Sequence, residues 1–162
     1  MTYFSKFPLY LTRTLGTEQV IITDFFRRIR VGRDFGDNFS GLTSYAITDG
    51  DTPESIANQF YGSPFYHWVI LLVNGIVNVR EEWPMEWFPF ETFMRDNYTN
   101  INGLLHYENP DTGYEEDPTD QSIPITNYEY EQSKNENKRQ IRILDPDYLS
   151  LFVQTFENKI AK

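Results

Sequence analysis

Residues 45–76 decide the fold, and they read YAITDGDTPESIANQFYGSPFYHWVILLVNGI. The alternation of Tyr45 and Ile47 with smaller side chains predicts a short strand. Thr52 and Pro53 then predict a helix start, because a threonine hydroxyl can cap free N–H groups and proline at the first helical position sacrifices no hydrogen bond. The apolar residues of this helix share one face: Ile56, Ala57 and Phe60.

A second helix follows between Ser63-Pro64 and Asn74-Gly75, two pairs that typically begin and end helices. A return strand is then expected near Ile76–Val79, which gives the order strand, helix, helix, strand. From helical spacing, the side chains expected in the core are Ile56, Phe60, Trp68 and Leu72.

The order and spacing of these elements resemble the LysM module. The residues that carry the resemblance are Gly50-Asp51-Thr52, Ile56-Ala57 and Asn74-Gly75-Ile76. LysM modules bind N-acetylglucosamine polymers such as peptidoglycan or chitin, so the resemblance implies a glycan-binding module as one alternative. The groove residues that it implies are Gly50, Asp51, Thr52, Pro53, Asn74, Gly75 and Ile76. Pro53 departs from the LysM pattern, in which a large apolar residue is usual.

A second resemblance covers most of the chain. The combination of Tyr61-Gly62, His67–Ile70, Asn74–Ile76 and Trp83-Pro84 is similar to the baseplate wedge subunit of T-even-type contractile-tailed bacteriophages, the gene-53 product family. Two flanking segments are similar to that family's N-terminal arm and to its C-terminal strand and helix: Val20–Val31, and Asn135–Leu144 with Pro146 and Tyr148-Leu149.

This resemblance implies a structural subunit of the inner baseplate that joins neighbouring wedges in a six-fold ring. The implied partners are the other wedge subunits and the sheath-initiating protein. The implied location is the virion tail, with host cytoplasm during assembly, and no cofactor is implied. Peptidoglycan is a partner only in the LysM alternative.

The predicted fold class is α+β, with a small LysM-like βααβ unit, an extended N-terminal arm and a C-terminal strand-plus-helix extension. The arm, with one strand, is expected over 1–40, and the βααβ unit over 41–80. Residues 81–162 are expected to form an acidic, aromatic extension that contains a hairpin and the C-terminal strand and helix.

The extension shows several local signals. Residues 103–117 predict a hairpin around a turn at Asn109–Gly113. Residues 114–140 are expected to form an extended excursion, that is, a segment that contributes few side chains to a core. Gln140–Leu144 predicts a strand, and Asp145 caps a final helix. The apolar stripe of that helix could serve the chain's own core or a partner: Leu149, Phe152, Val153, Phe156 and Ile160.

Composition narrows the function classes. The chain has no cysteine, and its formal net charge is −10. Residues 81–131 hold thirteen acidic residues and one basic residue, so a phosphate backbone would be repelled and nucleic-acid binding is not expected. No stretch approaches the roughly 20 apolar residues of a membrane span, so no membrane partner is expected. Aromatic residues make up 17% of the chain, and this aromatic area must be covered either by the fold itself or by partners, since protein interfaces favour aromatic side chains.

No catalytic constellation is visible. There is no nucleophile elbow and no phosphate-binding glycine loop, and the histidines, His67 and His106, have no third metal ligand at a matching spacing. Adjacent acids occur at 81–82 and 115–117, but acids on a solvated loop stay ionised, whereas a catalytic acid needs an apolar pocket. We therefore expect no enzyme activity, no cofactor and no metal.

Partner-binding residues are expected among arginines and tryptophans. Four arginines fall within seven residues, and guanidinium groups suit interface ion pairs with carboxylates. Their acidic partner is either the chain's own segment 108–120 or a neighbouring subunit, and we favour the neighbour because the resemblance implies an outward-reaching arm. The candidates are Arg27, Arg28, Arg30, Arg33, Trp83 and Trp87.

Overall fold

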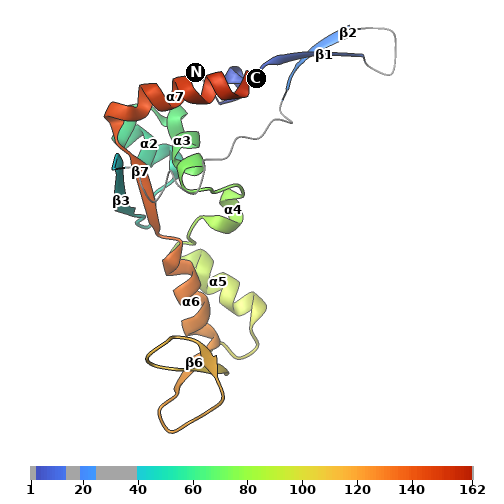
Figure 1. Ribbon diagram of the computed structural model, residues 1–162. Coiled ribbons are helices and arrows are strands. Elements are labelled where there is room, and N and C mark those ends of the chain that lie inside the picture. The colour runs from blue at the N-terminus through green and yellow to red at the C-terminus, as the bar shows by residue number, and fades with distance from the viewer. Residues whose placement is uncertain (1–2, 14–18, 25–39, 162) are drawn as a thin grey trace. The chain divides into compact units, whose positions relative to one another are not determined.

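The computed structural model describes residues 3–13, 19–24 and 40–161, and it mixes helices and strands as the α+β prediction requires (Figure 1). Two compact units interleave along the sequence. Unit 1 comprises Met1–Tyr45, Asp51–Val79 and Ile141–Lys162, and unit 2 comprises Ala46–Gly50 and Arg80–Gln140. Consecutive domains at 1–40, 41–80 and 81–162 remain a prediction.

The central sheet pairs β3 (Leu42–Ala46) with β7 (Gln140–Leu144). The N–H of Ile47 donates to the carbonyl of Arg139, and the N–H of Asp145 donates to the carbonyl of Gly41, both at 2.9 Å, so the strands are antiparallel. The predicted alternation of β7 is confirmed, because its isoleucines are buried and Arg142 is exposed.

The expected return strand near Ile76–Val79 is wrong. Val79–Glu82 instead forms the short helix α4. The N–H of Ile76 donates to the carbonyl of Leu71 at 2.9 Å, and Gly75 has φ 68°, a left-handed helix ending that turns the chain away from a strand. The strand that pairs with β3 is instead β7, which begins at the last residue of unit 2.

The two helices of residues 45–76 form as predicted. Helix α2 (Pro53–Tyr61) begins after Thr52, whose hydroxyl accepts from the N–H of Ser55, and it ends at Gly62 with φ 69°. The second helix begins as a 3-10 turn, η2 (Pro64–Tyr66), before α3 (His67–Val73).

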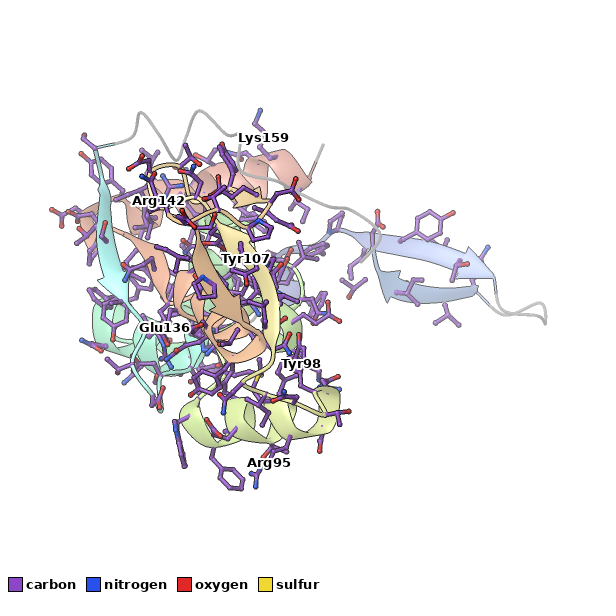
Figure 2. The ribbon with its side chains drawn as sticks, turned by 90° about the horizontal axis from the view of Figure 1, so that it is seen from below. Arg95, Tyr98, Tyr107, Glu136, Arg142 and Lys159 are labelled. Atoms are coloured by element: carbon purple, nitrogen blue, oxygen red, sulfur yellow. The ribbon has the colours of Figure 1, made fainter. Side chains whose placement is uncertain are left out.

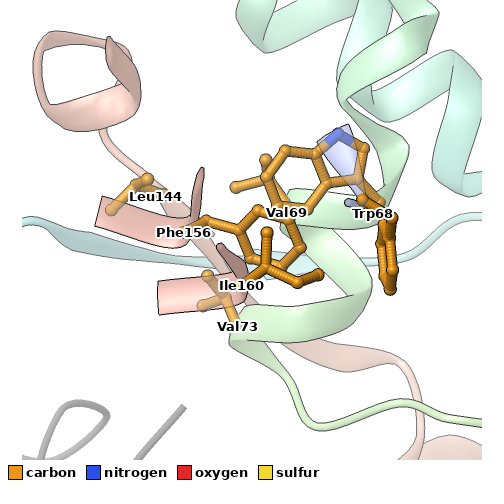
Figure 3. Close-up of a cluster of buried hydrophobic side chains, with 7 residues drawn as sticks. Trp68, Val69, Val73, Leu144, Phe156 and Ile160 are labelled. Atoms are coloured by element: carbon orange, nitrogen blue, oxygen red, sulfur yellow. The ribbon is translucent and has the colours of Figure 1, made fainter. Parts of the chain in front are cut away.

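The core of unit 1 lies between α3, β7 and α7 (Pro146–Ile160), as Figure 3 shows. The apolar stripe of α7 serves the chain's own core. Phe156 and Ile160 belong to the buried cluster, and the other three residues of the stripe pack against that cluster. Of the four expected core residues, Ile56 and Trp68 are buried, while Phe60 and Leu72 are half-buried. The cluster consists of Phe7, Trp68, Val69, Val73, Leu144, Phe156 and Ile160.

The N-terminal arm is more regular than expected. A 3-10 turn, η1 (Tyr3–Lys6), precedes an antiparallel pair of strands, β1 (Leu9–Arg13) and β2 (Gln19–Thr23). The side chain of Lys6 forms an ion pair with Glu157 of α7. The β1–β2 hairpin pairs Leu11 with Ile21 across its centre.

Unit 2 contains two helices and a small sheet. Helix α5 (Trp87–Asn97) buries Phe90 and Met94. The sheet has the order β5-β4-β6, and the predicted hairpin is confirmed by β4 (Leu104–Glu108) pairing with β5 (Glu115–Glu116).

The expected extended excursion at 114–140 is wrong in its second half. Residues Ile123–Thr126 form β6, and Asn127–Asn137 form helix α6. Thr126 caps α6: its hydroxyl accepts from the N–H of Glu129, and its own N–H donates to the Glu129 carboxylate. This local motif outweighs the poor helix periodicity of the acidic stretch.

Tyr61 makes stability sensitive to alkaline pH. Its hydroxyl donates to the carbonyl of Leu144 at 3.1 Å, and burial raises its pKa to about 12. Between pH ~10, where the unfolded chain loses this proton, and pH ~12, the folded state binds more protons, so stability falls as pH rises. We expect Tyr61→Phe to lose less stability across that interval, measured by urea unfolding. Tyr114→Phe, at an exposed site, is the control, and an equal loss in both variants would contradict this assignment.

Candidate protein-binding surfaces

Residues 50–53, which form one end of the implied sugar groove, have structural roles. Asp51 accepts a hydrogen bond from the hydroxyl of Tyr45 at 3.0 Å. Thr52 caps α2, and Pro53 is buried at its first position. Gly50 has φ 93°, which favours glycine, and its N–H donates to Glu86 in unit 2 at 3.2 Å.

The residues at the other end of that groove also stabilise the fold. The Asn74 amide donates to the carbonyl of Arg142 and accepts from its N–H, both at 2.8 Å, so this side chain pairs with β7 as a strand would. Gly75 and Ile76 form the left-handed ending of α3. The structure thus places Gly50 in unit 2 and the other six groove residues in unit 1. Each of the seven residues is buried or makes a contact that stabilises the fold.

The partner-binding candidates separate into three groups. Trp83 is half-buried, whereas Trp87, the first residue of α5, is 65% exposed. The arginine cluster lies outside the described residues: Arg27, Arg28, Arg30 and Arg33.

Arg139 is a residue that the sequence did not single out. Its guanidinium meets the carboxylate of Asp49 at 2.7 Å and that of Glu136 at 3.0 Å. It also donates to the carbonyls of Ile47 and Met85 at 3.2 and 3.3 Å. The hydrogen bond from Arg139 holds the pKa of Asp49 below its usual range. Arg139 therefore ties three chain segments of unit 2 together, and no local signal marks such a long-range role.

The acidic candidates lack the environment of a catalytic acid. Hydrogen bonds from Ser122 and Asn109 lower the pKa of Glu116, the opposite of what proton donation at neutral pH needs. A polar hollow of about 400 Å³ beside it is lined by Asn109, Pro110, Asp111, Glu116, Thr119, Asp120 and Gln121. Over the described ranges, no three His, Asp or Glu side chains gather closely enough to hold a metal ion.

The β1–β2 hairpin presents large apolar side chains to solvent. The two strands are neighbours of each other, and opposite residues share a face, so Leu11 and Ile21 lie together on one face while Tyr10 lies on the other. A hairpin that is apolar on both faces needs a covering layer to be stable in water. Its exposed large residues are Leu9 (71%), Tyr10 (58%), Leu11 (55%), Val20 (38%) and Ile21 (64%).

Helices long and apolar enough to cross a bilayer are not found within the described part of the chain.

Comparison with known proteins gives one family. The sequence model of a family described as Base plate wedge protein 53 matches residues 2–115, which is more than half of the chain. The match is to a phage family, as the second resemblance predicted, and it carries no LysM assignment. No curated protein matches the chain.

Proposed function

Since this chain belongs to the base plate wedge protein 53 family, we propose that it joins neighbouring wedge subunits in the inner ring of a contractile-tail baseplate by protein–protein contacts. Its work is binding rather than catalysis. Its partners are the other wedge subunits and the sheath-initiating protein, in a six-fold assembly inside the virion tail. Assembly takes place in the host cytoplasm.

The β1–β2 hairpin carries this proposal. Its exposed side chains would be an aggregation liability on a protein that works alone, because both faces of the strand pair are apolar. In an assembly the same residues become buried, and the gain of about 25 cal/mol per Å² of apolar area offsets the cost of ordering the arm.

The arginine cluster and the tryptophans belong to the same proposal. Arginines at 27, 28, 30 and 33 would meet carboxylates of a neighbouring subunit. Trp87 exposes most of its ring and fits the aromatic anchors that protein interfaces favour.

Replacing the central cross-strand pair of the hairpin tests this function. We expect Leu11→Thr/Ile21→Thr to leave the melting temperature nearly unchanged, since both side chains are exposed and threonine keeps the strand propensity. The amount of the variant in purified tails should fall by about tenfold or more, equivalent to at least ~1.4 kcal/mol of lost contact.

The measurement is quantitative mass spectrometry of tails from cells that express the variant during infection by a phage lacking this gene. Val77→Thr, at an aliphatic residue outside the hairpin that is 76% exposed, is the matched control. Absence of the wild-type chain from tails would refute the proposed function, and full incorporation of the hairpin variant would refute the role of the hairpin.

A further inference from the structure

Helix α5 has an aromatic end that points out of unit 2. Trp87 and Phe88, its first two residues, are 65% and 67% exposed, whereas Phe90 and Met94 of the same helix are buried. Figure 2 shows α5 with Arg95 on one side and Tyr98 just past its C-terminal end. Two adjacent exposed aromatic rings are costly in water and are typical of an interface.

The backbone beneath these rings is held firmly. The N–H of Trp87 donates to the carboxylate of Asp49 at 3.3 Å, and the carbonyl of Phe88 accepts from the hydroxyl of Thr92 at 3.1 Å. The carbonyl of Glu86 accepts from the N–H of Phe90 at 3.0 Å. A partner that covers the rings therefore loses little free energy in ordering the backbone that carries them.

Three carboxylates belong to residues that adjoin or contact the first turn of α5. Asp49 is paired with Arg139, but the carboxylate of Glu86 accepts from the N–H of Gly50, and that of Glu91 accepts from the hydroxyl of Tyr128. These last two donors are neutral, so they orient the carboxylates without cancelling their charge. Glu91 lies four residues after Trp87, on the same side of the helix.

The charge of the chain is confined to the unit that carries this surface. Unit 2 contains fifteen acidic and five basic residues, which gives −10, the formal charge of the whole chain. Unit 1 contains nine of each and is neutral. A second copy has no unit with net positive charge, but its unit 1 contains the four arginines at 27, 28, 30 and 33, so the cross-linking experiment below distinguishes a second copy from a different subunit. Nucleic acid would be repelled by this surface.

We propose that the aromatic end of α5, formed by Trp87 and Phe88 with Glu86 and Glu91, docks onto a positively charged surface of a different subunit. The rings fill apolar depressions, and lysine or arginine side chains around them meet the carboxylates. This contact is separate from the hairpin contact, and it rests on the proposed baseplate function.

Incorporation into tails tests the surface. Trp87→Ala/Phe88→Ala is expected to lower the amount of the chain per tail at least tenfold while the melting temperature of the purified protein stays unchanged. Tyr114→Ala, which removes a 77% exposed aromatic ring from the same unit, is the matched control and should incorporate normally.

Photo-cross-linking tests the partner's chemistry. The chain with Phe88→p-benzoylphenylalanine is incorporated into tails, irradiated and digested, and the cross-linked peptide is sequenced. We expect a peptide of a different subunit with net positive charge. Glu86→Gln/Glu91→Gln, which keeps the acceptor oxygens, should weaken the cross-link severalfold at low salt and should reduce its salt dependence.

The outcomes separate the two proposals. If tails contain the wild-type chain and also incorporate the Trp87/Phe88 variant normally, the docking proposal is wrong and the baseplate function stands. A cross-link to a second copy, or to an acidic peptide, would overturn the basic partner. Absence of the wild-type chain from tails would overturn the baseplate function itself.

Discussion

Replacing Trp68 by alanine is expected to cost about 3–5 kcal/mol of unfolding free energy, because it empties the centre of the core of unit 1. The indole is 4% exposed. Its ring centroid lies 4.6 Å from that of Phe156 and 5.5 Å from that of Tyr3, so the side chain joins α3, α7 and the N-terminal turn. A small domain has roughly 5–15 kcal/mol of stability, so this loss removes a large part of it.

Chemical denaturation of Trp68→Ala and Trp68→Phe measures this effect. The indole N–H of Trp68 is buried without a hydrogen-bond acceptor, so phenylalanine removes an unpaired donor as well as volume and should cost clearly less than alanine. Trp87→Ala is the control, since the same change at a 65% exposed site should stay within about 0.5 kcal/mol. An unchanged midpoint for Trp68→Ala would place Trp68 at an interface instead.

Replacing Asn135 by leucine is expected to cost about 1–3 kcal/mol, because it leaves the N–H of Met85 without an acceptor and removes one of the two donors to the Met85 carbonyl, the other being Arg139. The Asn135 amide oxygen accepts from the N–H of Met85 at 2.7 Å, and its nitrogen donates to the carbonyl of Met85 at 2.8 Å. Asn135 is the buried polar residue among the described side chains, at 5% exposure, and leucine fills its volume without restoring either bond.

Hydrogen exchange locates this effect within the chain. Amides of α5 and α6 in unit 2 should lose protection, while amides of α3 and α7 in unit 1 should keep theirs. Asn137→Leu, at an exposed position on the same helix, is the matched control. Asn135→Asp should also destabilise unit 2, because it places a carboxylate oxygen against the Met85 carbonyl. Equal protection in Asn135→Leu and Asn137→Leu would show that the pair of hydrogen bonds contributes little.

The sequence by itself determined where the helices of unit 1 begin and end. Thr52 and Pro53 begin α2, and Asp145 caps α7, as their side chains predict. These features are local, since a cap bonds to groups two or three residues away and a helix face repeats within four residues. The same locality explains why the hairpin turn at Asn109–Gly113 was predictable.

The candidate site was predictable only in part. The sequence identified Trp87 as a partner-binding candidate from residue type, and the structure shows its ring exposed at the start of α5. The apolar hairpin was missed as a regular element because residues 1–19 carry Pro8 and Gly16, which interrupt any periodicity. From the sequence, the apolar stripe on α7 could belong either to the core or to a partner interface. Its packing with Trp68 in one buried cluster shows that it belongs to the core.

Tertiary structure alone decided which strand completes the sheet and what holds unit 2 together. Ile76–Val79 has the composition of a strand, but β7 lies beside β3 because Asn74 pairs with its backbone and its isoleucines become buried there. Asn135 and Arg139 act across fifty or more residues of sequence. A single sequence carries no signal for such pairs, since their free energy depends on burial and geometry that exist only once the chain has folded.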